Sequence, residues 1–113
     1  TLPFLEADAR GPAEMMKSIR RIAAGIIADG KIPVMLGGEH SISFGAVQAV
    51  REAFPELTVL QLDAHADLRD EYNGSKFNHA CVMARDGGRL RPGDSALVAR
   101  TRPALSERPA RSR

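Results

Sequence analysis

The fold of this chain is decided by residues 32–67, which read IPVMLGGEHSISFGAVQAVREAFPELTVLQLDAHAD. Two short apolar runs, 32–36 and 57–62, are rich in aliphatic and β-branched residues, which is typical of strands buried in a parallel sheet. Between them, residues 41–53 carry apolar side chains at helical spacing, with Ser41 as the expected N-cap. A strand, a helix and a second strand in this order predict a βαβ unit, and therefore an α/β fold with a parallel sheet.

A further helix is expected before this unit. Gly11-Pro12 opens it, because proline is favoured in the first turn of a helix. Apolar side chains then recur at helical spacing from Met15 to Ile27. Gly30 fits the left-handed position just past a helix end, so we expect the helix to stop at Asp29. Residues 1–10 are predicted to form a loop.

Length and composition exclude several classes of protein. A chain of 113 residues, 43% hydrophobic and 27% charged, is expected to form one soluble globular domain at most. No apolar run approaches the roughly 18 residues of a membrane helix, and no N-terminal stretch has the pattern of a secretory signal. The single cysteine, Cys81, excludes an internal disulfide. These features predict a cytoplasmic protein with no membrane partner.

Charge divides the chain into two parts. Residues 1–85 carry nine Lys/Arg and eleven Asp/Glu, whereas residues 86–113 carry seven and three. We expect one weak strand at 95–99 and disorder over 100–113, where little apolar surface remains. The interpretation is a 1–85 α/β domain followed by a diverged basic tail at 86–113. Because this tail has no aromatic residue on which bases could stack, no nucleic-acid partner is expected.

The second apolar run is followed by Asp63-x-His65-x-Asp67. If the strand continued through the motif, alternate side chains would share a face at the carboxyl end of the sheet, where α/β proteins bind ligands. Two carboxylates and an imidazole suit a divalent cation such as Mn²⁺. In the alternative interpretation, the two aspartates cap a turn and His65 is solvated. For this motif alone, the two interpretations are evenly balanced.

His40 follows the first apolar run as His65 follows the second. Neighbouring parallel strands end at the same sheet edge, so we expect His40, Asp63, His65 and Asp67 to converge there. Taken alone, His40 is better explained as a histidine at a helix start, and Gly37-Gly38 as an ordinary turn. The conjunction of both motifs favours a metal site.

Two motifs together carry a family resemblance. Residues 37–42, GGEHSI, followed by residues 62–67, LDAHAD, resemble the arginase/agmatinase ureohydrolases, which hold two manganese ions. Residues 67–72 and 78–83 are more similar to the agmatinase branch than to arginase proper. The resemblance covers about residues 12–85. It implies that this domain is part of an arginase-like, three-layer α/β/α parallel sheet.

The resemblance also implies roles for five residues. Asp63 would bridge both metal ions, His40 and Asp67 would bind the first, and His65 would bind the second. His79 would be the active-site histidine, which shuttles a proton or steadies the substrate. An imidazole side chain is in general a natural proton carrier near neutral pH. By spacing alone, His79 is also compatible with a surface histidine before a helix.

Three nearby residues are expected to have supporting roles. Glu39 would lie behind the metal ligands and orient His40. Ser41 is expected to cap a helix and not to act as a nucleophile. Cys81 is expected to be a small buried residue and not a catalytic thiol.

The implied activity is metal-assisted hydrolysis of a guanidino compound, with agmatine converted to putrescine and urea. Arginase or another guanidino or formimino hydrolase is a less favoured assignment. The family also needs a later Asp-x-Asp pair, and the only aspartates after Asp70 are Asp86 and Asp94. We therefore expect a fragment, and whether it is an enzyme or a non-catalytic metal-binding piece stays open. Family members are homo-oligomers; the state of this chain is not predicted.

Overall fold

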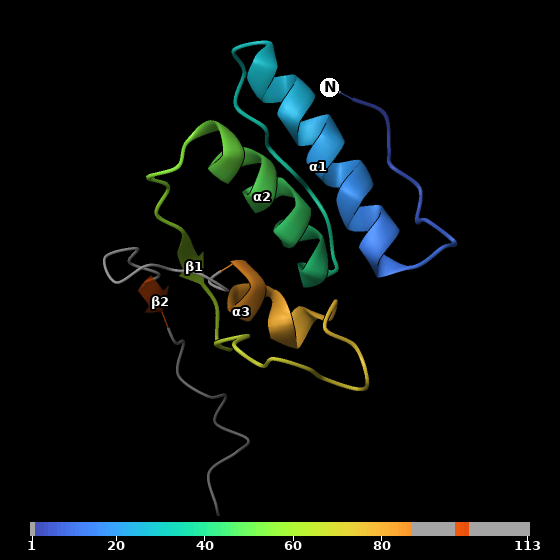
Figure 1. Ribbon diagram of the computed structural model, residues 1–113, viewed down its shortest axis with the longest axis vertical. Coiled ribbons are helices and arrows are strands. Elements are labelled where there is room, and N and C mark those ends of the chain that lie inside the picture. The colour runs from blue at the N-terminus through green and yellow to red at the C-terminus, as the bar shows by residue number, and fades with distance from the viewer. Residues whose placement is uncertain (1, 87–96, 100–113) are drawn as a thin grey trace, which may run out of the picture.

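The computed structural model describes residues 2–86 and 97–99 (Figure 1). These residues form three α-helices, two 3-10 helices (η) and two short strands. In order they are α1 (Pro12–Ala28), η1 (His40–Ile42), α2 (Ser43–Ala53), β1 (Leu60–Leu62), η2 (His79–Cys81), α3 (Val82–Asp86) and β2 (Leu97–Ala99). The disorder expected over 100–113 lies outside the described residues. None of the helices within residues 2–86 is long and apolar enough to cross a membrane.

Helix α1 forms where the sequence predicts it. Pro12 occupies its first position, and Gly11 precedes it with φ 109°, a conformation that favours glycine. At the other end, Gly30 has φ 70° and its N–H donates to the Ile27 carbonyl at 2.9 Å. The predicted start and stop signals of this helix are therefore confirmed.

Helices α1 and α2 pack directly against each other (Figure 1). Their close approach depends on Gly45, because a Cβ at that position would lie 2.4 Å from the Met16 carbonyl oxygen. Ala49 is buried one turn further along α2. The apolar core of the described residues lies among the three helices. Its members are Met16, Ile19, Ala23, Ala49, Cys81, Val82 and Met83.

The start of α2 differs from the prediction. Ser41 does not cap the helix; it lies inside η1, and α2 begins at Ser43. Glu39 is the residue that caps, because its carboxylate accepts hydrogen bonds from the backbone N–H of Ser41, at 2.9 Å, and from the Ser41 hydroxyl. Glu39 thus caps η1, whereas α2 begins without a side-chain cap.

The parallel sheet forms only in part. Strand β1 covers three of the six residues expected at 57–62, and it pairs in parallel with β2, with Leu60 opposite Leu97 and Leu62 opposite Ala99. The weak strand expected at 95–99 is confirmed over residues 97–99. The described residues therefore combine helices with a two-stranded parallel sheet.

The first apolar run, 32–36, was expected to be a buried strand, and that prediction is wrong for the described structure. The run is not a strand, and Ile32 and Leu36 are 87% and 94% exposed. The physical reason is that a strand needs a partner for its backbone, and no described residue forms a ladder with this run.

Candidate metal centre

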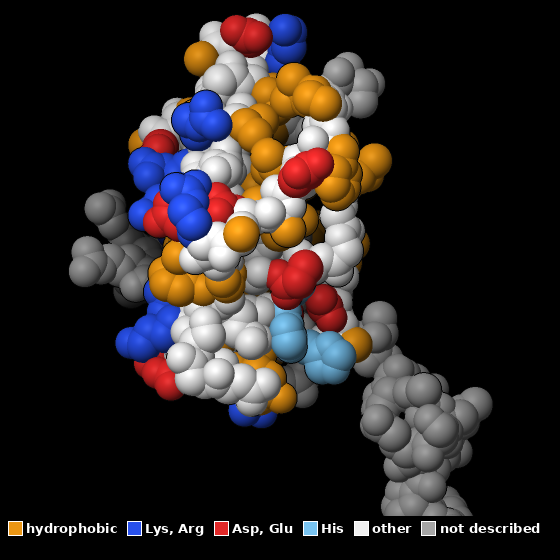
Figure 2. All heavy atoms as spheres, turned by 90° about the vertical axis from the view of Figure 1, so that its right-hand side faces the viewer, with side chains coloured by type: hydrophobic (Ala, Val, Ile, Leu, Met, Phe, Trp, Pro, Cys, Tyr) orange, Lys and Arg blue, Asp and Glu red, His pale blue; other side chains and the backbone are white. Residues whose placement is uncertain are grey.

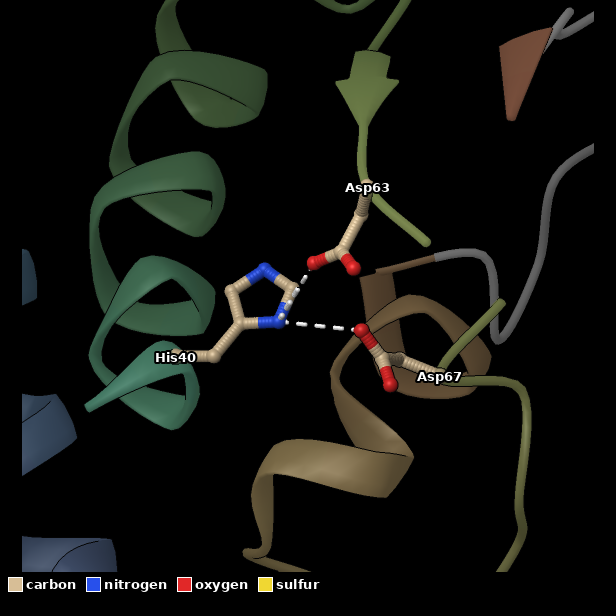
Figure 3. A group of neighbouring side chains, drawn as sticks. All are labelled: His40, Asp63 and Asp67. Atoms are coloured by element: carbon tan, nitrogen blue, oxygen red, sulfur yellow. Dashed lines mark ion pairs between the residues drawn. The ribbon is translucent and has the colours of Figure 1, made fainter. Parts of the chain in front are cut away.

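Three of the four predicted metal ligands lie together (Figure 3). The Nδ1 atom of His40 is 3.0 Å from Oδ2 of Asp67 and 3.9 Å from Oδ2 of Asp63. One ligand atom from each of these residues lies within 4.8 Å of the others. His40 comes from η1, and both aspartates follow β1. The predicted approach of His40 to the two carboxylates is confirmed, while their role as ligands stays a prediction.

The geometry that brings the aspartates together is a turn and not a strand. Strand β1 ends at Leu62, and the Oδ1 atom of Asp63 accepts a hydrogen bond from the backbone N–H of His65 at 2.9 Å. Asp67 has φ 50°, in the left-handed region that non-glycine residues rarely adopt. The argument from strand alternation was therefore wrong, although two of the three side chains still point toward His40.

The turn after β1 leaves His65 outside the group formed by His40, Asp63 and Asp67. The side chain of His65 is 84% exposed, and its Nδ1 lies 3.6 Å from Oδ1 of Asp63. His65 is not one of the three residues whose ligand atoms gather. The described structure thus brings together His40, Asp63 and Asp67, with His65 beside them.

Asp67 is held by contacts at both its backbone and its side chain. Its carbonyl oxygen accepts from the N–H groups of Met83, at 3.0 Å, and Ala84, at 3.2 Å, at the start of α3. Its carboxylate, with a side chain only 8% exposed, accepts from Nε2 of Gln61 at 3.1 Å. Gln61 was missed by the sequence argument. The signal that could have found it is a polar residue between two leucines in an apolar strand.

Hydrogen bonding and nearby charge lower the pKa of the Asp63 carboxyl. The N–H of His65 lowers the pKa of the Asp63 carboxyl below its ordinary value; partial burial opposes this, and the nearby charge of His40 adds to it. One imidazole nitrogen and two carboxylates form a nitrogen and oxygen donor set. The three residues fit a divalent cation, since a shared ion would also relieve the repulsion between the two aspartates.

His79 lies on the neighbouring 3-10 turn, where η2 contacts η1. Its Nδ1 is 3.8 Å from Oε1 of Glu39, and its ring meets the Tyr72 ring edge-on, with 5.9 Å between centroids. Glu39 was expected to orient His40. Instead, its carboxylate caps η1 and lies beside His79. The side chain of Asn78, which accepts from the Ala80 N–H at 3.1 Å, caps η2.

The segment between Asp67 and His79 forms a small hairpin. Tyr72 and Ser75 pair across a turn in which Asn73 and Gly74 both have positive φ, at 51° and 73°. The Arg69 guanidinium lies 4.9 Å from the centroid of the Tyr72 ring. Figure 2 shows histidine and acidic side chains gathered on one face of the molecule, below a group of hydrophobic side chains.

Comparison with known proteins gives consistent matches. A model of the arginase family matches residues 5–110. An N(1)-aminopropylagmatine ureohydrolase of Synechocystis sp. is 51% identical over 84 residues, which are 74% of this chain and 26% of that protein. An agmatinase of Pyrococcus horikoshii is 50% identical over 85 residues, covering 74% of this chain and 27% of that one.

A solved structure is also similar to this chain. It is the agmatine ureohydrolase of Thermoplasma volcanium, with 35% sequence identity and a TM-score of 0.66. The match covers 83% of this chain and 33% of that one. The chain spans about a quarter of the length of the curated relatives it matches.

Proposed function

This chain belongs to the arginase family, and on that premise we propose that it supplies the metal-binding segment of a manganese-dependent ureohydrolase. The substrate class is a linear guanidino compound, with agmatine as the favoured member and putrescine and urea as products. The names of the similar proteins support this class, since they act on agmatine or its aminopropyl derivative. The observation that carries the proposal is the meeting of His40, Asp63 and Asp67 within 4.8 Å.

In this proposal, His40, Asp63 and Asp67 would hold the manganese ions together with His65. Two bound cations would lower the pKa of a shared water, so that it reacts as hydroxide near neutral pH. Hydrogen bonds to its backbone carbonyl and to its carboxylate already hold Asp67 in the position that a ligand would need. His65 would join these ligands by a rotation of its exposed side chain, whose Nδ1 lies 3.6 Å from Oδ1 of Asp63.

His79 is the proposed proton carrier. Because Oε1 of Glu39 lies 3.8 Å from its Nδ1, the proton of the neutral imidazole is favoured on Nδ1, which leaves Nε2 to exchange with the substrate. Attack of hydroxide forms a C–O bond at the guanidinium carbon, and the C–N bond to the alkyl chain breaks. The hydroxyl group of the adduct gives its proton to Nε2 of His79, and Nε2 passes this proton to the leaving nitrogen, so that urea and a neutral amine are released.

The same premise supports finer properties of the whole enzyme. They are a three-layer α/β/α architecture, a cytoplasmic location and a homo-oligomeric state. The second candidate is a non-catalytic cation-binding chain. It is favoured by one observation, the lack of an Asp-x-Asp pair after Asp70 in these 113 residues. For this reason we expect no urea release from the 113-residue chain by itself.

A chimera tests the proposed function. Residues 12–85 replace the matching segment of the Pyrococcus horikoshii agmatinase, and urea release from agmatine is measured with and without Mn²⁺. We expect Mn²⁺-dependent activity, which Asp63→Ala removes. Gln48→Leu, a change on α2 outside the group of candidate ligands, should leave the activity intact. A folded chimera that binds Mn²⁺ but releases no urea would favour the non-catalytic alternative.

A further inference from the structure

We propose that Gln61 is a positioning residue of the metal centre. Its side-chain amide nitrogen donates to the Asp67 carboxylate and to the His65 carbonyl, and it thereby holds the turn that presents Asp67 to His40. The inference deepens the proposed function and rests on it, because it gives Gln61 a role toward the residues proposed to bind the metal.

Burial is the first part of the argument. On β1, Leu60 and Leu62 are exposed, whereas Gln61 between them is only 7% exposed and points to the opposite face of the strand. A buried amide destabilises a protein unless its polar atoms find partners. Nε2 of Gln61 has two, the His65 carbonyl at 3.2 Å and Oδ2 of Asp67 at 3.1 Å.

The amide oxygen of Gln61 provides the second argument. The Oε1 atom of Gln61 is buried and has no hydrogen-bond partner among the described residues. A leucine or methionine would fill this position without that cost. Stability alone therefore does not explain a glutamine whose Oε1 has no partner. The two hydrogen bonds of its Nε2 atom, which hold the turn, do explain it.

The third argument is that Asp67 needs contacts that hold its backbone and its carboxylate in place. Its φ of 50° is unfavourable for a residue with a Cβ, and its carboxylate lies close to that of Asp63. The bond from Gln61 goes to Oδ2, the same oxygen that lies 3.0 Å from Nδ1 of His40. An amide fixes this oxygen without adding a positive charge, so it does not compete with a cation for the carboxylate.

The test compares the only two glutamines of the chain. Gln61→Met keeps the length of the side chain and removes its donor. Gln48→Met makes the same change on α2. Mn²⁺ affinity of the 113-residue chain is measured by calorimetry, and circular dichroism checks that each variant is folded. We expect Gln61→Met to weaken Mn²⁺ binding about tenfold, as is common for residues behind metal ligands, and Gln48→Met to change it less than twofold.

A second measurement needs no metal. In NMR spectra of the metal-free chain, the Gln61 side-chain amide protons should exchange with solvent more slowly than those of Gln48. Gln61→Met should shift the resonances of His40 and Asp67. If the amide exchanges freely, or if folded Gln61→Met leaves Mn²⁺ affinity and those resonances unchanged, the proposal is overturned.

The two measurements separate this inference from the function on which it rests. If the unchanged chain binds no Mn²⁺ while the Gln61 amide is protected and Gln61→Met shifts His40 and Asp67, the positioning role is supported and the metal function is not. If the chain binds Mn²⁺ and Gln61→Met does not weaken it, the metal function stands and the role of Gln61 is wrong.

Discussion

The helices and the strand region of this chain are held in different ways. Helices α1 and α2 meet through buried apolar side chains and the close approach at Gly45. The strand region leaves Leu60 and Leu62 exposed and keeps its order through polar contacts, above all those of Gln61 and Asp67. Among the described residues, apolar packing therefore supports the fold, and hydrogen bonds shape the candidate site.

This difference has a practical consequence for mutations. Changes in the helix pair should alter the free energy of unfolding, because they act on close-packed contacts. Changes around His40 and Asp67 should alter ligand binding more than stability. Four predictions test this separation, each on one part of the molecule.

The largest effect is expected from Gly45→Ala. The added Cβ would lie 2.4 Å from the Met16 carbonyl oxygen, a backbone atom that cannot move without separating the helices. We expect a loss of about 1–3 kcal/mol in the free energy of unfolding, measured by urea denaturation. The control is Gly25→Ala, where the added Cβ meets no atom within 4 Å and should stabilise the helix. Equal stability of the two variants would mean that the helix contact is looser than described.

The next effect concerns metal binding. Asp67→Ala should lower Mn²⁺ affinity at least tenfold, measured by calorimetry, because it removes a carboxylate that lies against His40. His65→Ala should have a smaller effect, since its side chain is turned outward. Because few ligands are present, we expect the dissociation constant of the unchanged chain for Mn²⁺ to lie above the micromolar range. We also expect Mn²⁺ to be preferred over Zn²⁺ in function. Tight binding of two ions by the 113-residue chain would contradict this.

A smaller effect is expected in the first apolar run. Val34 is 81% exposed, so Val34→Ser should change the free energy of unfolding by less than about 0.5 kcal/mol. Ala49→Ser also introduces a hydroxyl group, but at a buried site of α2, and it should therefore destabilise the protein more than Val34→Ser does. Thermal melts of both variants measure the difference. A loss above 1 kcal/mol for Val34→Ser would show that this run is packed in solution.

The smallest effect is expected at the loop before α1. The Arg10 guanidinium, hydrogen-bonded to Asp8, lowers the pKa of Asp8 to about 2. Because this folded-state pKa is depressed, the pair stabilises the protein at pH values above the ordinary pKa of Asp8, and this contribution is lost as the pH falls toward 2. Arg10→Ala should return the pKa of Asp8 toward 3.8, followed by carboxyl NMR. Lys17→Ala, which removes one of the two ion-pair partners of Glu14, should leave the Asp8 titration in place.

Sequence patterns predicted the helices better than the strands. The spacing of Met16, Ile19 and Ala23 is a property of α1 itself, so local sequence is enough to place it. The run at 32–36 has the composition of a strand, but a strand also depends on a partner elsewhere in the chain, which composition does not reveal. Strands β1 and β2 form because the backbone of each pairs with that of the other.

The candidate site was predicted in part, and for a reason that needed correction. His40, Asp63 and Asp67 meet as expected, yet a turn with a left-handed Asp67 brings them together and not the alternation of a strand. The positions of Gln61 and Glu39 depend on which buried donors and acceptors face each other. That information exists only once the turns are folded.

One feature of the turn also bears on how this protein can change through evolution. The backbone of Asp67 is bonded to Met83 and Ala84, and the N–H of Arg69 donates to the Ala80 carbonyl at 3.0 Å. These main-chain bonds close the loop at its base, so they depend little on the identity of the side chains at 70–78. The loop can therefore acquire substitutions or insertions while Asp67 and His79 keep their places in the fold.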